Sequence, residues 1–189
     1  MEKKKIILAI TGASGSAYAK LLMQEIDKLS EQLDEAGIVF SKTALKVWEH
    51  ELISPPSVSP IFKQYAPDDF FSPIASGSSG FDTMIICPCS MGTLGRIANG
   101  ISDDLITRSA DVMLKERRNL ILVPRETPYN LLHIRNMEKL LLAGALILPA
   151  TPSFYSKPAD VNELLMTVVE RILVHAGFKI DHFKWGSKC

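Results

Sequence analysis

Residues Ile6-Ile-Leu-Ala-Ile10 run directly into Thr11-Gly-Ala-Ser-Gly15, and this junction sets the expectation for the rest of the chain. Five consecutive apolar residues predict a strand buried on both faces, as in a parallel sheet covered by helices. Beyond the glycine-rich turn, apolar residues recur at helical spacing, at Leu22, Ile26, Leu29 and Leu33. The opening is therefore a strand, a tight turn and a helix, which is the first unit of a parallel α/β sheet.

The same alternation continues along the chain. Further strands are predicted at residues 37–40, 83–86, 120–123 and 146–148. Helices are predicted through Leu45 and Trp48, up to about residue 100, and over 105–118, 131–143 and 161–176, the last with Gly177 as its cap. This order predicts a Rossmann-like (flavodoxin-like) three-layer α/β sandwich with a mostly parallel sheet.

Composition narrows the function classes. The chain has 189 residues, 47% of them apolar, which suits a single domain with an adequate core. Its 21 basic and 21 acidic residues cancel, which argues against a nucleic-acid-binding or membrane-surface protein. The first apolar run is too short for a signal-peptide core, and residues 140–148 are too few to span a bilayer. We therefore expect a cytoplasmic location, with no membrane or nucleic-acid partner.

Two segments depart from the alternation within this single domain, residues 1–189. Residues 53–80 contain five prolines and end in Ser76-Gly-Ser-Ser-Gly80, which predicts an irregular excursion over the sheet edge and a candidate lid. Residues 178–189 form a tail that carries Trp185 and several basic residues but no secondary-structure pattern.

Candidate ligand-binding segments follow the predicted strands, because ligands of open α/β sheets bind beyond the carboxyl ends of the strands. Thr11-Gly-Ala-Ser-Gly-Ser16 offers glycines and hydroxyls at a helix N-terminus, which suits a phosphate monoester, although Ser14 or Ser16 could equally be a plain helix cap. Ser90-Met-Gly-Thr93 repeats this arrangement after another strand. Two such loops on neighbouring strands favour a phosphorylated ligand.

Other chemistries lack their signatures. Cys87-Pro-Cys89 has no second cluster to complete a zinc site, and the odd number of cysteines does not form a disulfide framework. The histidines are scattered, and no Gly-x-Ser-x-Gly elbow is present, which argues against a serine hydrolase. Arg108 and Lys115 share a helix face with Asp111, as in a solvated ion-pair ladder. Arg171 flanks an apolar stripe, a position typical of snorkelling or of a cavity mouth.

Taken together, these motifs resemble those of a known family. The matching segments are Thr11-Gly-Ala-Ser-Gly15, Ala75-Ser-Gly-Ser-Ser79, Cys87-Pro-Cys-Ser-Met-Gly-Thr93, Arg108 with Ala110-Asp-Val112 and Lys115-Glu-Arg117, Pro124-Arg-Glu126, Asn136-Met137 and Pro152-x-Phe-Tyr155. The sequence resembles the flavin prenyltransferases, the UbiX-like family that includes small subunits named with phenolic-acid decarboxylases. The resemblance runs from about residue 6 to residue 185.

The resemblance implies a flavoprotein enzyme that joins a dimethylallyl group to N5 and C6 of reduced FMN. The implied donor is dimethylallyl monophosphate, and the product, prenylated FMN, is the cofactor of a UbiD-type decarboxylase. Members of the family generally need no metal. They typically assemble as homo-oligomers, usually dodecamers, with sites at the subunit interfaces.

The resemblance also implies site residues, at the positions of this sequence that match the motifs of the family. The implied FMN contacts are Gly12, Ala13, Ser14, Ser41, Ser90, Met91, Gly92, Thr93 and Arg125. The implied grip on the phosphate of the prenyl donor consists of Lys115, Tyr155 and Arg171, with Arg108 as an additional member. Ser14, Glu51 and Glu126 are the implied catalytic residues, and Phe70 would line the prenyl pocket from the lid. Met91 replaces a Thr of some relatives, which leaves only a backbone contact certain there.

This assignment agrees with the chemistry. Cleavage of the allylic C–O bond builds negative charge on the leaving phosphate, which Lys115, Arg171 and Tyr155 would stabilise. Loss of the flavin C6 proton needs a base, which Glu126 or the departing phosphate could provide. Two other functions stay open: an FMN-binding carrier, and a structural subunit of a decarboxylase complex. An FMN-dependent cysteine decarboxylase would need an Ala-Asn-Thr loop in place of Cys87-Pro-Cys-Ser90.

Overall fold

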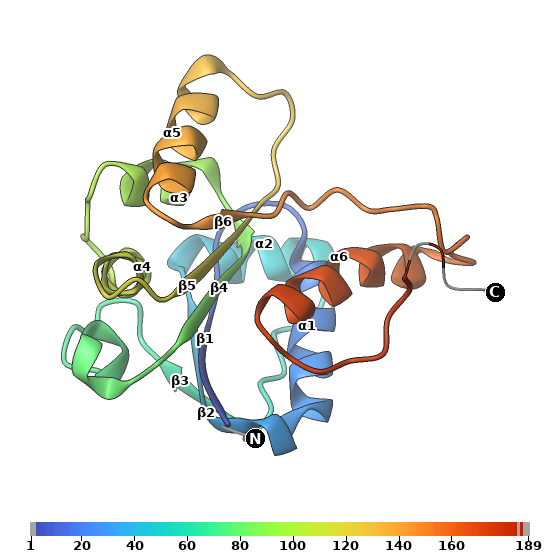
Figure 1. Cartoon of the computed structure of the whole chain (residues 1–189), viewed down its shortest axis with the longest axis horizontal. Helices are drawn as coiled ribbons and strands as arrows, with labels where there is room; N and C mark the ends of the chain where they lie inside the picture. The colour runs from blue at the N-terminus through green and yellow to red at the C-terminus, as the bar shows by residue number, and fades with distance from the viewer. Residues whose placement is uncertain (1–2, 185, 187–189) are drawn as a thin grey trace.

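The computed structural model describes residues 3–184 and 186, and within them one sheet of six strands, all pairs parallel, forms the centre of the molecule (Figure 1). Its strand order is β3-β2-β1-β4-β5-β6. The strands are β1 (Lys4–Ile10), β2 (Leu33–Phe40), β3 (Phe62–Tyr65), β4 (Thr83–Cys89), β5 (Asn119–Pro124) and β6 (Leu146–Ile147). This is the doubly wound Rossmann order, so the predicted fold class is confirmed.

Helices cover both faces of the sheet, as Figure 1 shows. They are α1 (Ser16–Lys28), α2 (Lys42–Leu52), α3 (Met91–Ala98), α4 (Leu105–Lys115), α5 (Leu131–Leu142) and α6 (Val161–His175). One face packs against α1, α2 and α6, and the other against α3, α4 and α5. In the part of the chain that is described, no helix combines the length and apolarity needed to cross a bilayer.

Strand β1 explains why the opening residues are apolar at every position. Ile6 and Leu8 point into the cluster under α1 and α6, whereas Ile7 and Ala9 point into the cluster under α3 and α4. All four are fully buried. Alternate side chains of a strand face opposite sides of the sheet, so a strand in the middle layer must be apolar throughout.

The first helix is shorter than its apolar spacing predicts. Helix α1 ends at Lys28, a 3₁₀ turn (Ser30–Gln32) follows, and Leu33 begins β2 instead of a further helical turn. Leu33 pairs with Lys4 of β1 and is buried there. Sheet pairing therefore overrides the helical spacing, and the predicted helical place of Leu33 is wrong.

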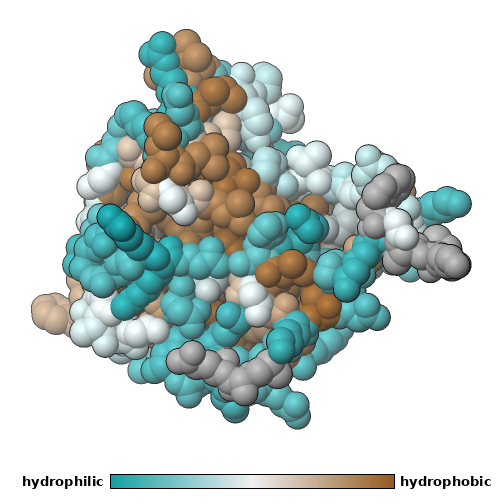
Figure 2. Space-filling model, viewed as in Figure 1, coloured by the Kyte–Doolittle hydropathy of each residue, from teal (hydrophilic) through white to brown (hydrophobic). Residues whose placement is uncertain are grey.

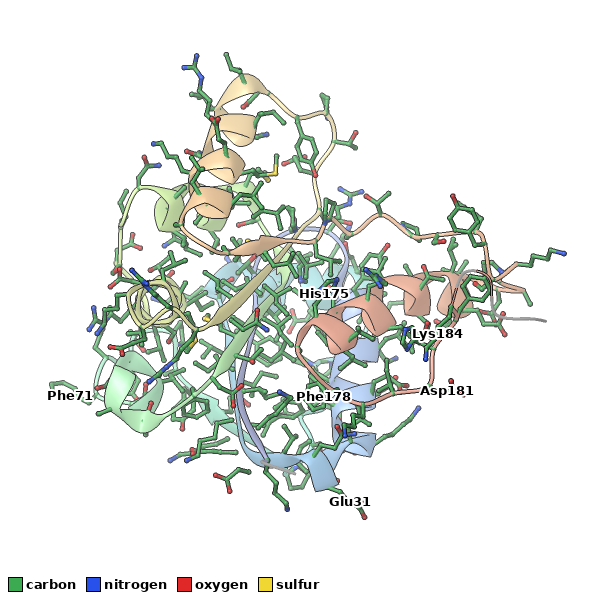
Figure 3. The ribbon with its side chains drawn as sticks, in the orientation of Figure 1. Glu31, Phe71, His175, Phe178, Asp181 and Lys184 are labelled. Atoms are coloured by element: carbon green, nitrogen blue, oxygen red, sulfur yellow. The ribbon has the colours of Figure 1, made fainter. Side chains whose placement is uncertain are left out.

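The proline-rich excursion is partly regular. It contains β3, which pairs with β2 and forms the sheet edge, and two 3₁₀ turns (Pro73–Ala75 and Gly77–Ser79). In β3 only the two terminal residues, Phe62 and Tyr65, are buried, which is typical of a short edge strand. Beyond it, Phe71 is fully exposed and points away from the molecule (Figure 3).

The end of α6 follows its prediction. Gly177 adopts the left-handed conformation (φ 79°), and the amides of Gly177 and Phe178 donate to Val174 and Leu173 at the helix end. The start of the tail is anchored, because Phe178 is buried and Lys179 exchanges two hydrogen bonds with the side chain of Gln32. Trp185, named with the tail, lies outside the described residues.

Candidate active site

The carboxyl ends of β1 and β4 lie side by side, at the point where the strand order reverses. The hydroxyl of Thr11 donates to the carbonyl of Pro88 (2.8 Å) and accepts from the amide of Ser90 (2.8 Å). This buried side chain therefore ties the two loops predicted to bind phosphate into one unit. Such a switch point is where open α/β sheets bind their ligands.

A cavity of about 430 Å³ opens at this point. It brings together five of the residues implied for FMN, namely Gly12, Ser41, Ser90, Gly92 and Thr93. Its remaining lining residues are Lys42, Thr43, Pro67, Asp68, Arg96, Asp103 and Asp104. Most of these residues follow the ends of β1, β2, β3 and β4, and Arg96, Asp103 and Asp104 come from α3 and the loop after it, so the cavity lies at the carboxyl ends of these four strands.

Three helices begin at this cavity. The N-caps of α2 and α3 are Ser41 and Ser90, whose hydroxyls accept from the amides of Ala44 (3.0 Å) and Thr93 (3.2 Å). The N-cap of α4 is the carboxylate of Asp104. Serine caps are neutral and leave further amides of the first turn available, so the starts of α2 and α3 can accept an anion.

Gly12 is required by the close approach of the first loop to α2. A Cβ atom at this position would lie 2.6 Å from Cβ of Thr43, and both residues line the cavity. Any side chain at Gly12 would therefore push the loop away from the start of α2 and fill part of the cavity.

Glu51 caps α1, the helix that follows β1. Its carboxylate accepts from the amides of Gly15 (3.1 Å) and Ser16 (2.7 Å), and the N-cap Gly15 has no side chain to do so. Burial raises the pKa of Glu51, but hydrogen bonds from the Ser14 hydroxyl and from these amides outweigh burial and hold the pKa below its ordinary value. These two amides are therefore engaged by Glu51, and a phosphate contact in this loop stays a prediction for its other residues.

The other implied flavin contacts do not line this cavity. Ala13 and Met91 are buried, and the side chain of Met91 packs in the core, so only its backbone is available to a ligand. Arg125 is exposed just beyond β5. Burial raises the pKa of Tyr18, and the nearby positive charge of Arg125 opposes this. The exposed Glu126 accepts from the amide of Thr127 (2.9 Å).

The residues implied for the prenyl donor do not meet within one chain. Lys115 ends α4 and pairs with Glu116 (2.8 Å), whereas Arg171 lies on α6, on the opposite face of the sheet. Arg108 donates to the carbonyl of Ala75 (3.1 Å) and pairs with Asp111. Tyr155 is exposed in the loop before α6. The four side chains therefore need neighbouring copies of the chain to form a single grip.

Arg171 faces a second cavity, of about 330 Å³, between β6 and α6. Its guanidinium lies 3.2 Å from Nε2 of His175 one turn later on the same helix. The other lining residues are mainly apolar and include Leu146, Ile147 and Val168. Arg171 therefore lies at a cavity mouth. Its sequence position beside the apolar stripe of the helix predicted either this or a snorkelling side chain.

The two cysteines of β4 are fully buried. Burial raises the pKa of the Cys87 thiol and raises that of Cys89 to about 12. Both side chains are therefore uncharged thiols at neutral pH, without the reactivity of a thiolate. This agrees with the structural role expected for Cys87-Pro-Cys89.

One exposed apolar patch lies on α5, as Figure 2 shows. Only Leu140 of this helix is buried, while five large apolar side chains are exposed, Leu131, Leu132, Ile134, Leu141 and Leu142. A patch of this kind on a protein of ordinary composition marks a contact surface.

Sequence patterns did not identify Arg96, Asp103 or Asp104. Arg96 Nη1 bonds to both carboxylates, at 2.6 Å and 2.8 Å, across the loop between α3 and α4. Asp104 and Thr107 form a capping box, a signal that the spacing of the two residues carries. No short motif joins Arg96 to its partners, because the two aspartates lie seven and eight positions later in the sequence, beyond the end of α3.

Comparison with known proteins identifies the family of the chain. The family model described as "Flavoprotein" matches residues 1–173. A flavin prenyltransferase UbiX from Methanocaldococcus jannaschii is 45% identical over 97% of this chain and 99% of its own, and the mitochondrial flavin prenyltransferase PAD1 of Saccharomyces cerevisiae is 42% identical over 96% and 75%.

Solved structures give the same result. AnUbiX (PadA1), in complex with FMN and dimethylallyl pyrophosphate, has a TM-score of 0.88 and 37% identity, covering 97% of this chain and 100% of its own. A dodecameric FMN-dependent UbiX-like decarboxylase from Escherichia coli O157:H7 has a TM-score of 0.87 and 36% identity over the same shares. With this identity over nearly its whole length, the chain belongs to the UbiX family of flavin prenyltransferases.

Proposed function

We propose that this enzyme transfers a dimethylallyl group from dimethylallyl monophosphate to N5 and C6 of reduced FMN, and that the prenylated FMN serves a UbiD-type decarboxylase. The observation that carries most weight is the 45% identity, over nearly the full length of both chains, to a flavin prenyltransferase. The cavity at the carboxyl edge of the sheet supports it, because its donors suit the phosphate of FMN.

The cavity residues fit the phosphate of FMN. The hydroxyls of Ser41 and Thr93 and the amide of Gly92 would hold the phosphate at the starts of α2 and α3, and the Ser90 hydroxyl would orient that of Thr93. Gly12 would lie against the flavin, since its missing side chain leaves this part of the cavity open. Reduced FMN supplies the nucleophilic atoms N5 and C6, and these residues hold and orient it.

The prenyl donor would bind where neighbouring copies of the chain meet. Lys115 and Arg171 lie on opposite faces of one chain, so we propose that a homo-oligomer brings them together with Tyr155 and Arg108. The dodecameric relative from Escherichia coli and the exposed apolar face of α5 support this assembly. As the allylic C–O bond breaks, its electron pair passes to the phosphate, whose growing charge these cations would stabilise.

The acidic residues have separate roles in this proposal. Glu126 is exposed beside Arg125 and would accept the proton lost from C6 when the ring closes. Glu51 would orient the Ser14 hydroxyl next to the flavin, since its own carboxylate is engaged by two amides. We also propose a cytoplasmic location and a reaction without a metal ion, as the sequence predicts.

A mass measurement tests the function. The purified chain is incubated without oxygen with reduced FMN and either dimethylallyl monophosphate or the diphosphate, and the extracted flavin is weighed by mass spectrometry. We expect a mass gain of one dimethylallyl unit with the monophosphate, and activation of a UbiD-type apo-decarboxylase by the product. Bound FMN of unchanged mass with both donors would instead indicate a carrier, and failure to bind FMN a structural subunit.

A further inference from the structure

The cavity proposed for the FMN phosphate carries more negative than positive side chains. Three of its lining residues are carboxylates, Asp68, Asp103 and Asp104, and two are cations, Lys42 and Arg96. Neither serine cap contributes a charge. A phosphate dianion entering this cavity would be repelled by the carboxylates unless their charge is compensated.

Arg96 compensates two of the three carboxylates directly. Its Nη1 lies 2.6 Å from Oδ1 of Asp103 and 2.8 Å from Oδ2 of Asp104, and its side chain is about one-third exposed. Hydrogen bonding to Arg96 holds the pKa of Asp103 below its ordinary value, so Asp103 is charged at neutral pH and pairs with the guanidinium. The arginine therefore turns this wall of the cavity from two negative charges to one.

The same guanidinium also reaches the start of α3. Its Nη2 donates to the hydroxyl of Thr93 (3.4 Å), which accepts a second hydrogen bond from the hydroxyl of Ser90 (3.1 Å). With both acceptor positions of the Thr93 oxygen used, its own proton is left to donate to another acceptor. A phosphate oxygen in the cavity would be that acceptor.

We propose that Arg96 is the residue that makes this cavity accept a phosphate dianion, so that the enzyme binds FMN in preference to riboflavin. It does so as a positioning residue, by neutralising Asp103 and Asp104 and by orienting the Thr93 hydroxyl. This inference rests on the proposed function, because it takes the cavity as the site of the FMN phosphate.

A purely structural role for Arg96 makes a different prediction. If the ion pairs only hold α3 against the start of α4, loss of Arg96 would loosen the whole site. The binding of FMN and of riboflavin would then weaken to the same degree. If Arg96 acts on the phosphate, only the affinity for FMN decreases, because riboflavin has the same ring and ribityl chain without the phosphate. Removal of one carboxylate from the Arg96 variant should then restore part of the lost affinity for FMN.

The test measures the dissociation constants of oxidised FMN and riboflavin, by quenching of flavin fluorescence, for the full chain and its variants. We expect Arg96→Gln to weaken FMN binding about 10- to 100-fold and riboflavin binding less than about 3-fold, as for the loss of a charged partner. The double variant that combines Arg96→Gln with Asp103→Asn should bind FMN about 5-fold more tightly than Arg96→Gln alone, because one carboxylate that repels the phosphate is gone. Arg135→Gln, which removes an exposed arginine of α5 outside the cavity, should bind both flavins like the parent.

Arg96→Lys covers the case in which Arg96→Gln does not fold. A lysine keeps the charge but cannot bridge two carboxylates and Thr93 together, so we expect an intermediate loss of FMN binding and unchanged riboflavin binding. Equal losses for the two flavins in either variant, or no gain from Asp103→Asn, would overturn the role of Arg96. A parent chain that binds FMN and prenylates it, combined with equal losses, would overturn this role and leave the proposed function in place.

Discussion

At the start of α1, the amides of Gly15 and Ser16 donate to the carboxylate of Glu51, which comes from the end of α2. This side chain supplies the negative charge that the helix N-terminus attracts. These two amides are therefore engaged by a protein carboxylate, and the phosphate in the proposed complex lies at the ends of β2 and β4 instead. A single carboxylate thus determines which helix start is available.

Loss of this carboxylate should destabilise the fold in a pH-dependent way. We expect Glu51→Gln to lower the free energy of unfolding by roughly 1 kcal/mol at neutral pH, as for loss of an N-cap. The folded-state pKa of Glu51 is lowered, so its stabilisation is present above the ordinary pKa of a glutamate and disappears as the pH falls through the folded-state value. Urea unfolding at several pH values should show the two proteins converging in acid. Glu49→Gln, exposed on the same helix, is the matched control and should match the parent at every pH.

Glu126 offers a separate test at the same scale. We expect Glu126→Gln to slow ring closure about 10²-fold or more, the usual contribution of a positioned base, with little change in FMN binding. Single-turnover flavin absorbance, together with FMN titration, separates the two effects. Equal turnover by variant and parent would show that another group, such as the departing phosphate, takes the proton.

Sequence patterns predicted some of the site residues and missed others for a physical reason. Gly12, Ser41 and Ser90 follow predicted strands, and the parallel sheet brings all strand ends to one edge. Arg96 contributes through ion pairs formed across a loop, and such contacts depend on the path of the loop rather than on local spacing. The Glu51 contact likewise joins the end of one helix to the start of another.

At the scale of helices, the four N-termini near the cavity differ in their caps. Those of α1 and α4 carry the carboxylates of Glu51 and Asp104, and those of α2 and α3 carry the serines Ser41 and Ser90. An aspartate caps a helix about as well as a serine does, so stability does not explain the difference. The proposed phosphate site accounts for the difference, because a neutral serine cap adds no charge that would repel a phosphate.

Exchange of a cap should therefore separate stability from binding. We expect Ser90→Asp to keep the unfolding free energy within about 0.5 kcal/mol of the parent, because the new carboxylate still caps α3. The same variant should bind FMN at least about 10-fold more weakly, because the added charge lies where the phosphate binds. Urea unfolding and FMN titration measure the two quantities. A variant that binds FMN like the parent would place the phosphate elsewhere.

The elements that the sequence predicts best are those whose burial is strongest. Strand β1 and helix α6 follow their apolar patterns, since β1 from Ile6 onward and the C-terminal half of the apolar stripe of α6 are buried. Strand β3 was missed because its two central residues are exposed and prolines precede it in the chain. The apolar spacing predicts too long a helix α1, because Leu33, a buried residue of β2, happens to continue the helical spacing.

At the scale of the whole molecule, the separation of Lys115 and Arg171 can be tested by mixing variants. Lys115→Ala and Arg171→Ala are each expected to abolish most activity, because each removes a cation from the leaving phosphate. If one site takes Lys115 from one copy and Arg171 from another, oligomers reassembled from an equal mixture should regain about a quarter of the activity per site. Activity that stays at the level of the single variants would mean that one chain supplies both residues.

Helix α5 buries a single side chain, Leu140, packs Met137 partly against the core, and leaves most of its apolar residues in water. Its backbone hydrogen bonds are therefore held mainly by the helix itself, and a helix of 12 residues is marginal on that basis. In a lone subunit the amide protons of α5 should exchange with deuterium ahead of those of α4, whose inner face is buried. Slow exchange along α5 would then report that neighbouring subunits have joined.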